Sequence, residues 1–535
     1  MPATTITTTS YTTCPLCEAT CGLEVTTAGR EVVAIRGDKE DVFSQGYICP
    51  KAFSLKALDA DPDRLRTPLV KRDGVWQSVS WDEAFAEVER RLMPILREHG
   101  RDAVATYLGN PNVHNLSAQL YDTPLLRALG SRNAYSASTV DQMPKQVSAG
   151  MMFGGSLSIP IPDVDATDYL LILGANPLVS NGSLMTAPGM RDRLRRLRAR
   201  GGRVVVIDPR RTRTAEEADE HQFIRPGTDP YLLFALVHTL FEENLVQPGR
   251  LAEHLNGLEE VRALARDFAP EAVAPICGIA AADMRRIARA LAGAPRAAVY
   301  ARIGTCTQAF GTLASWLVDV LNALTGNLDR AGGALFPKAA AGAYNTSGTP
   351  GIGPGFRFGK ARSRVRGLPQ VYGELPVVCL AEEITTPGEG QVRALMTVAG
   401  NPVLSTPDAD ALDAALAQLD FMVSVDFYLN ETTRHADVIL PPPSPLERSH
   451  YDLAFAQLSI RNIAHYSPPV IAREPGRQDE WEILLRVTGI LAGQGAGAEV
   501  AALDDFVAAQ AVQREVKLPG SRIEGHDPAE VLAAL

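Results

Sequence analysis

Four of the seven cysteines lie within the first 49 residues, in the order Cys14-x2-Cys17-x3-Cys21-x27-Cys49. Four thiolates can hold a cubane iron–sulfur cluster, one per iron, and such sites commonly combine three closely spaced cysteines with a distant fourth. A four-cysteine zinc site is the alternative, although zinc sites usually use two Cys-x-x-Cys pairs. The spacing therefore favours an iron–sulfur cluster and leaves zinc open.

The composition is that of a globular protein, with 46% hydrophobic residues, 21% charged residues and a net charge of −10. A negative chain argues against nucleic-acid binding, which needs a clustered positive surface. No apolar stretch approaches the roughly 20 residues that span a bilayer. The Thr-rich N-terminus has no Arg-Arg pair and no apolar signal core. We therefore expect a cytoplasmic protein with reduced thiols, no membrane segment and no nucleic-acid partner.

The four cysteines lie in residues 1–66, a segment of short polar stretches. This segment lacks the apolar content for a core of its own, so we expect a metal centre to stabilise it. Beyond it, apolar runs alternate with helical patterns, which is typical of doubly wound parallel sheets. Ser80 is the expected N-cap of a helix over residues 81–96. The expected strands cover residues 168–174, 203–207, 297–304, 394–400 and 421–425, and the expected helices include residues 308–324 and 409–419. Residues 339–373 are predicted to form a long irregular loop.

Two of these units resemble each other, because each runs from a strand through Gly, Asn and Pro to a helix and a second strand that ends on Asp. Ligands of open α/β sheets bind beyond the carboxyl ends of the strands, so both loops are candidate nucleotide sites. Backbone N–H groups in such turns can meet a pyrophosphate. The chain has no Gly-x-Gly-x-x-Gly motif, which disfavours an ordinary NAD site.

The cysteine spacing, together with Gly46-Tyr47-Ile48-Cys49-Pro50-Lys51, resembles the molybdopterin oxidoreductases of the DMSO reductase family, which include nitrate reductase and formate dehydrogenase catalytic subunits. Further motifs follow in the family's order, from residue 14 to about residue 450: Trp81-Asp82-Glu83-Ala84, Gly174-Ala175-Asn176-Pro177, Asp208-Pro209-Arg210, Arg225-Pro226-Gly227-Thr228-Asp229, Leu324-Thr325-Gly326-Asn327, Gly400-Asn401-Pro402 and Ala436-Asp437-Val438-Ile439-Leu440-Pro441. The ordered set implies a [4Fe–4S] cluster rather than zinc.

The resemblance implies a multi-domain α/β fold. A small [4Fe–4S] domain would cover residues 1–66, and one doubly wound pterin-dinucleotide domain would combine residues 67–135 and 340–490. A second, Rossmann-like domain over residues 136–339 would be inserted in it. Residues 491–535 would be a remnant leading to a further C-terminal domain, absent from this sequence, that closes over the pterins in relatives.

The cofactor implied by the resemblance is molybdenum, or tungsten, held by two molybdopterin guanine dinucleotides. Lys51 would lie between cluster and pterin, and Gln308 near the metal, with His114 and Arg302 as further candidates to face substrate. The positions matching one dinucleotide site are Gly174, Asn176, Asp208, Arg210, Asp229 and Gly304, and those matching the other are Gly400, Asn401, Asp426 and Asp437.

The metal ligand is expected within residues 130–145. Relatives supply Cys, selenocysteine or Ser from this segment, with a Pro three residues later, and an ungapped match places Asp141 at the ligand position and Pro144 at the offset. A hard carboxylate oxygen suits a high-valent oxo-metal. A shifted register would nominate Ser138 or Ser136 instead. The segment contains no cysteine, which disfavours a formate dehydrogenase of the Cys or selenocysteine type.

The function implied by the resemblance is two-electron chemistry on a small-molecule substrate at the metal, by transfer of an oxygen atom or a hydride equivalent. Electrons would pass through the cluster to or from a ferredoxin, a flavoprotein or an NADH-oxidising subunit. Two alternatives are a non-redox, hydratase-like enzyme on the same scaffold and an inactive cofactor-binding scaffold subunit.

Overall fold

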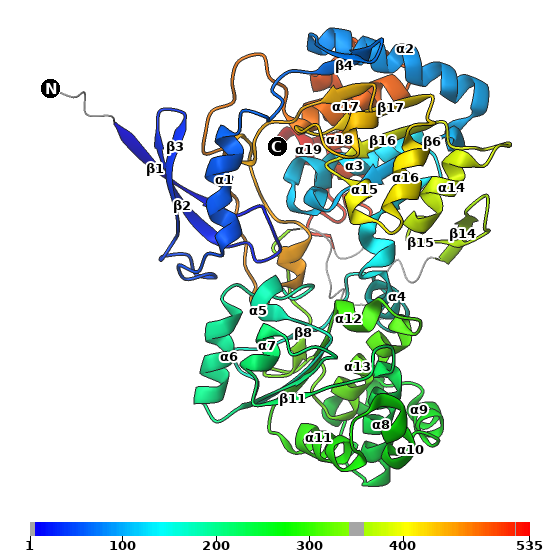
Figure 1. The fold of residues 1–535 in the computed structure, drawn as a ribbon. Coiled ribbons are helices and arrows are strands. Elements are labelled where there is room, and N and C mark those ends of the chain that lie inside the picture. Colours follow the sequence, from blue (N-terminus) through cyan, green and yellow to red (C-terminus); the bar gives the residue numbers. More distant parts are fainter. Residues whose placement is uncertain (1–5, 342–357, 519–520, 535) are drawn as a thin grey trace.

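The computed structural model describes residues 6–341, 358–518 and 521–534. Figure 1 shows two lobes, each built around its own sheet, with the N-terminal segment in blue beside both. The predicted α/β class is confirmed. The domain boundaries given above remain predictions. No helix in the described parts is long and apolar enough to cross a membrane.

The N-terminal segment forms an antiparallel sheet of β1 (Thr7–Thr13), β2 (Gly22–Ala28) and β3 (Glu31–Gly37), against which α1 (Pro50–Ala60) packs. Contrary to expectation, it has a small apolar core. Leu23, Val25 and Leu55 are fully buried there, next to the thiols of Cys14 and Cys21. Two residues from far along the chain complete this core, Leu446 and Ile471. A hydrophobic contribution from a distant segment explains why residues 1–66 alone look too polar.

The upper lobe contains a seven-stranded sheet in the order β5-β4-β18-β17-β16-β6-β7 (Figure 1). Its five parallel strands are β7 (Ala134–Ser136), β6 (Val104–Leu108), β16 (Ala394–Val398), β17 (Phe421–Val425) and β18 (Val438–Leu440). The antiparallel pair β4 (Leu69–Arg72) and β5 (Val75–Ser78) extends one edge. The covering helices include α2 (Trp81–His99), α3 (Leu116–Leu129), α14 (Leu380–Thr385), α16 (Ala409–Leu416) and α17 (Glu480–Leu491).

The lower lobe contains a parallel sheet of β11 (Glu220–Gln222), β10 (Arg203–Ile207), β9 (Tyr169–Leu173) and β12 (Ala297–Ala301), in that order. Both faces are buried, since alternate residues of β9 enter two different apolar clusters. The flanking helices include α6 (Met190–Ala199), α8 (Asp229–Glu242), α11 (Ala281–Gly293) and α13 (Gly311–Leu324). Helix α4 (Met143–Phe153) packs against α13.

The remaining elements are shorter or peripheral. The helices are α5 (Pro177–Ser180), α7 (Arg213–Glu216), α9 (Leu258–Ala265), α10 (Pro270–Cys277), α12 (Ile303–Cys306), α15 (Pro402–Ser405), α18 (Val500–Glu515) and α19 (Pro528–Ala534). The strands are β8 (Ile161–Pro162), β13 (Ala334–Leu335), β14 (Phe358–Arg362) and β15 (Pro369–Val371). Strands β14 and β15 form an antiparallel hairpin, so the predicted irregular loop over residues 339–373 is wrong for this part. Residues 342–357 of that prediction lie outside the described residues.

Candidate functional site

The four N-terminal cysteines converge between β1, β2 and the start of α1. Cys14, Cys17 and Cys21 lie in the loop that joins the two strands, where the Cys14 N–H donates to the Cys21 carbonyl at 2.8 Å. Cys49 is the residue before α1. Burial raises the pKa of the Cys14 thiol to about 12, and the neighbouring Cys17 and Cys49 thiols add to the shift. Four thiols that affect one another electrostatically form a single site.

The four thiols could hold a cluster or a single metal ion. One zinc would bind all four sulfurs at about 2.3 Å, whereas a cubane binds each thiolate through its own iron. The raised pKa values also mean that thiolates are costly here without a positively charged partner. Iron bound to the sulfurs would supply that charge.

Lys51 lies in the first turn of α1, two residues after Cys49, and its side chain is exposed. Its ammonium group lowers the pKa values of Cys14 and Cys17, against the larger effect of burial. The structure therefore places a cation near these two thiols.

A second convergence of charged groups lies next to the cysteines. Glu18 follows Cys17, and burial raises the pKa of its carboxyl to about 7; Arg302 and His114 oppose the shift, while Asp141 adds to it. The Glu18 Oε2 accepts the Leu184 N–H at 2.8 Å. Four ionisable groups from separate parts of the chain thus share one region. Sequence reasoning named the other three and missed Glu18.

One carboxylate oxygen of Asp141, the expected metal ligand, has no hydrogen-bond partner among the described residues. Asp141 follows a 3-10 helix over Ala137–Val140, and burial raises its pKa, with Arg302 opposing the shift. The unpartnered atom, Oδ1, lies 3.9 Å from Arg302 Nη2. A buried, unpartnered carboxylate oxygen fits a hard metal ligand. The competing Ser136 hydroxyl instead donates to Glu374 at 2.6 Å.

His114 is held in a defined orientation beside this region. It is buried, its ring stacks on Phe455 with centroids 4.8 Å apart, and its Nδ1 lies 3.4 Å from Asp452 Oδ2. His114 also lines the cavity beneath the upper sheet. A carboxylate on Nδ1 leaves the other ring nitrogen to face that cavity.

The cavity beneath the upper sheet measures about 530 Å³ and runs along the carboxyl ends of the parallel strands. Three predicted cofactor residues line it, Gly400, Asn401 and Asp426, together with Leu16 and Leu58 of the N-terminal segment. Burial raises the pKa of Asp426 to about 6, although the Tyr428 N–H donates to its carboxylate. The cavity is thus bounded by residues of the N-terminal segment at one end and by the glycine–asparagine turn at the other.

The turn in this cavity is held by its asparagine. Asn401 donates through Nδ2 to Glu431 at 2.8 Å and accepts the Thr432 hydroxyl at 2.7 Å through Oδ1. A Cβ on Gly400 would lie 2.6 Å from the ring of Tyr107, so only glycine fits there. The turn is therefore rigid before any ligand arrives.

Five predicted residues also meet at the carboxyl edge of the lower sheet. Gly174 adopts φ +53° and touches the backbone of Gly304, where either added Cβ would clash at 3.0 Å or less. Gln308 Nε2 donates to Asp229 Oδ2 at 2.8 Å and to the Gly304 carbonyl at 3.0 Å. Asp208 is near enough to help burial raise the pKa of Asp229. Two carboxylates, a carboxamide and a close-packed glycine pair thus share this edge.

Two other residues assigned to this site, Asn176 and Arg210, contact neighbouring turns rather than the Gly174–Gly304 pair. Asn176 Oδ1 accepts the Thr214 hydroxyl at 2.7 Å and its N–H, so this oxygen holds α7 against the turn. Arg210 is exposed, and its N–H donates to Asp208 Oδ1 at 2.8 Å.

Asp437 lies away from the cofactor edge. It precedes β18, at the amino ends of the parallel strands, where its carboxylate accepts the Met422 N–H and Arg91 Nη1, both at 2.8 Å. The cavity beneath the upper sheet does not include it. The structure therefore gives Asp437 a role in joining α2 to the sheet.

Substituting Asp437 with alanine should lower the free energy of unfolding by about 1–3 kcal/mol, because the Met422 N–H loses its acceptor and Arg91 keeps only the Asp420 carbonyl. Iron and molybdenum content should stay unchanged. Chemical denaturation and metal analysis check both, with Asp413→Ala, which removes a surface partner of Arg434, as the control. Loss of molybdenum at unchanged stability would instead support the original assignment of Asp437 to the cofactor site.

Two family models match the chain. The molybdopterin oxidoreductase model matches residues 64–487, and the Fe4S4 domain model of molybdopterin oxidoreductases matches residues 7–57. The chain belongs to the molybdopterin oxidoreductase family. Molybdopterin and a [4Fe–4S] cluster are the cofactors of the two matched models, and the second match spans all four clustered cysteines.

Curated molybdopterin oxidoreductases resemble the chain at low identity. Formate dehydrogenase H of Escherichia coli (strain K12) is 27% identical over 449 residues, which are 81% of this chain and 62% of that protein. The assimilatory nitrate reductase catalytic subunit of Bacillus subtilis (strain 168) is 27% identical over 461 residues, 82% of this chain and 62% of that protein. The chain thus spans less than two thirds of these relatives.

The fold of the family is also seen in a solved structure. Acetylene hydratase from Pelobacter acetylenicus has a TM-score of 0.74 at 20% identity, covering 90% of this chain and 69% of that one. This likeness shows the fold of the chain.

Proposed function

We propose that this molybdopterin oxidoreductase catalyses two-electron oxidation or reduction of a small molecule at a molybdenum or tungsten bis(molybdopterin guanine dinucleotide) centre, with electrons relayed through the [4Fe–4S] cluster. The main support for this proposal is a junction beside the cysteine loop, where four ionisable residues lie close together: Asp141, Arg302, Glu18 and His114. The proposed dinucleotide sites at the carboxyl edges of the two sheets flank this junction. When bound, the cofactor supplies the two-electron chemistry and the path to the cluster.

Each group of residues has a proposed role. The four cysteines hold the cluster, and Asp141 binds the metal through its unpartnered oxygen. Gly400, Asn401 and Asp426 hold one dinucleotide, and the lower sheet edge holds the other through Gly174, Asn176, Asp208, Arg210, Asp229 and Gly304. Arg302 and His114 would orient substrate at the junction.

Lys51 is proposed to favour electron transfer by stabilising the reduced cluster. Replacing it with glutamine should make the reduction potential of the cluster more negative, because a cation beside an added electron is lost. The expected shift is on the order of tens of millivolts, since the side chain is exposed and water screens the interaction. A redox titration followed by electron paramagnetic resonance measures it.

The control for Lys51 is another lysine of α1. Lys56 donates to the Val33 carbonyl at 2.8 Å on the side of β3, so Lys56→Gln should leave the potential unchanged. Equal shifts in both variants would mean that only net charge matters, and no shift in either would refute the proposed role of Lys51.

The metal content tests the function as a whole. The chain would be purified anaerobically from a host that makes the pterin, and iron, molybdenum, tungsten and zinc would be counted per chain. About four irons with one molybdenum or tungsten are expected. A ferredoxin, a flavoprotein or an NADH-oxidising subunit is the proposed electron partner, so turnover should require an added donor or acceptor.

Other outcomes contradict specific parts of the proposal. Zinc in place of iron would refute the cluster. Iron without the heavier metal would refute the catalytic role and indicate a scaffold subunit. Turnover without any electron donor or acceptor would replace oxidoreduction by a hydratase-like reaction on the same fold.

A further inference from the structure

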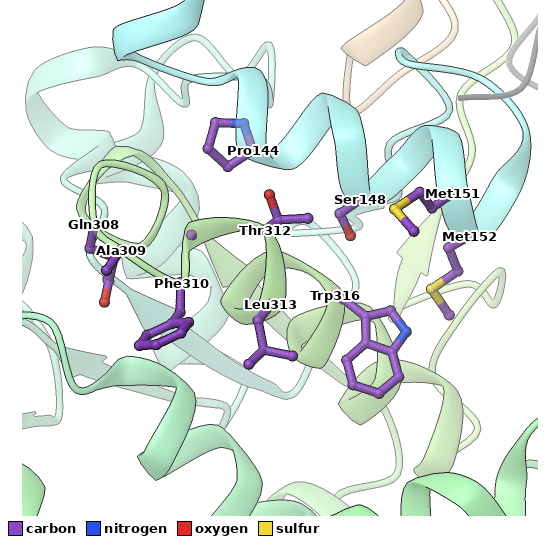
Figure 2. Close-up of a pocket in the computed structure, with 11 residues that line it drawn as sticks. Pro144, Ser148, Met151, Met152, Gln308, Ala309, Phe310, Thr312, Leu313 and Trp316 are labelled. Carbon is purple, nitrogen blue, oxygen red and sulfur yellow. The ribbon is translucent and has the colours of Figure 1, made fainter. Parts of the chain in front are cut away.

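A second cavity, of about 660 Å³, lies between α4 and the start of α13 (Figure 2). Figure 2 shows Gln308 at one end and Met152 and Trp316 at the other. The size falls in the range of about 300–1,000 Å³ that is usual for pockets holding small organic ligands. It shares no lining residue with the cavity beneath the upper sheet.

The walls of this pocket are apolar and uncharged. Met151, Met152, Phe310 and Trp316 are among the lining residues, none of which carries a charge in the described chain. Met151 and Phe310 are 66% and 54% exposed, so two large apolar side chains face solvent at its rim. These side chains make the rim of the pocket apolar. An anion would find no cation here, which points to a neutral occupant.

Two polar groups in the pocket lack partners. Ser148 on α4 is 1% exposed, and its hydroxyl oxygen has no hydrogen-bond partner among the described residues. Gln308 uses Nε2 to bond two acceptors, Asp229 and the Gly304 carbonyl, so its Oε1 is turned away from them and stays buried without a partner. Buried polar atoms normally find a hydrogen bond. The unsatisfied hydroxyl and carboxamide oxygen call for a ligand with a hydrogen-bond donor.

The pocket adjoins the metal-ligand candidate. Helix α4 begins two residues after Asp141, and α12 begins directly after Arg302, whose side chain meets Asp141. Pro144 lines the pocket one turn beyond Asp141, and Met151 lies about 10 Å further along the helix at 1.5 Å per residue. The buried pair of Lys145 and Asp319, 2.7 Å apart, holds α4 against α13.

We propose that this pocket binds the organic substrate, a neutral molecule with an apolar body and a single hydroxyl or amino group. Its identification as the substrate rests on the function proposed above, whereas binding of such a molecule does not. Nitrate and formate, both small anions, do not match these walls.

Fluorine NMR on the purified full chain tests binding with three probes of similar size: 4-fluorobenzyl alcohol, 4-fluoroethylbenzene and 4-fluorobenzoate. The alcohol should bind saturably and the benzoate should not. Ser148→Ala should weaken binding of the alcohol about threefold to tenfold, the cost of one hydrogen bond, and leave 4-fluoroethylbenzene unaffected. Ala309→Trp, at an exposed lining position, should fill the pocket and abolish binding of both.

Ser117→Ala, which alters another buried helical serine away from the pocket, is the matched control and should change nothing. Saturable binding of the alcohol to Ala309→Trp would contradict the proposal that this pocket is the binding site. Absence of binding to the unchanged chain would contradict it as well. Equal binding of 4-fluorobenzoate would contradict the proposal that the ligand is neutral. In dye-coupled turnover, Ala309→Trp should raise KM without lowering kcat, and an unchanged KM would overturn the substrate role.

Metal counts on the same samples separate the two proposals. Probe binding without molybdenum or tungsten would refute the proposed redox function and leave the pocket standing. Metal at full content without probe binding would refute the pocket alone.

Discussion

Replacing Cys49 with serine should reduce the iron content from about four per chain to near zero. Cys49 is the proposed fourth ligand and the N-cap of α1, so its loss would open one corner of the site where the other three thiols lie in a single loop. A serine hydroxyl at the same place is a poor ligand for iron of this type. Iron analysis and the visible absorption of the cluster measure the effect.

The same substitution should loosen the N-terminal sheet. The thiols of Cys14 and Cys21 are part of the small core that includes Leu23 and Leu55, so loss of the cluster leaves buried sulfur atoms without their partner. Hydrogen exchange across β1–β3 should therefore become faster. Cys277→Ser, at a buried cysteine of α10, is the control and should keep its iron. Full iron content in Cys49→Ser would remove Cys49 from the ligand set.

Replacing Asp141 with alanine should cost at least about 100-fold in metal affinity or turnover, because loss of a supporting second-sphere group alone typically costs 10–100-fold. The Oδ1 atom has no partner in the described structure and is 3.9 Å from Arg302, so removing it also leaves the guanidinium facing an empty position. Molybdenum content and the Mo(V) resonance of the reduced enzyme report the ligand directly, independently of turnover.

Ser138→Ala and Ser136→Ala are the matched controls for Asp141. Both serines lie in the same segment, and the hydroxyl of Ser136 is committed to Glu374. Each variant should keep its molybdenum and its Mo(V) resonance. An altered resonance in Ser138→Ala with a normal one in Asp141→Ala would shift the ligand assignment by three residues.

Local sequence features predicted elements accurately where one physical cause dominates. The strand over residues 203–207 is found as β10, because four consecutive apolar, β-branched residues, Val204–Ile207, lie between a glycine pair with Arg203 and an Asp-Pro turn. Ser80 caps α2 in a capping box with Glu83, as the Ser-x-x-Glu spacing predicts. The hairpin of β14 and β15 was not predicted, since its two short strands have no alternating apolar pattern.

The candidate site was predictable where residues follow a strand or a motif, and not where contacts join distant segments. The Asp437 carboxylate was assigned to the cofactor, but an Asp before a strand lies at the opposite edge from one after it. The pair of His114 and Asp452 joins positions 338 residues apart. Glu18 gives no signal of its own, because its importance comes from burial beside Asp141 and Arg302.

The N-terminal core can be completed only after two residues from far along the chain have been synthesised. Leu446 and Ile471 close the core around Cys14 and Cys21, and Ser467 accepts the Thr13 N–H at 2.9 Å. At about 5–20 residues per second, a ribosome needs on the order of 20–80 s to make the roughly 400 residues that separate these segments. During that interval the cysteine loop is exposed on the nascent chain. The cysteine loop can therefore be enclosed only after residues 446–471 have been made, and until then it must be protected from oxidation.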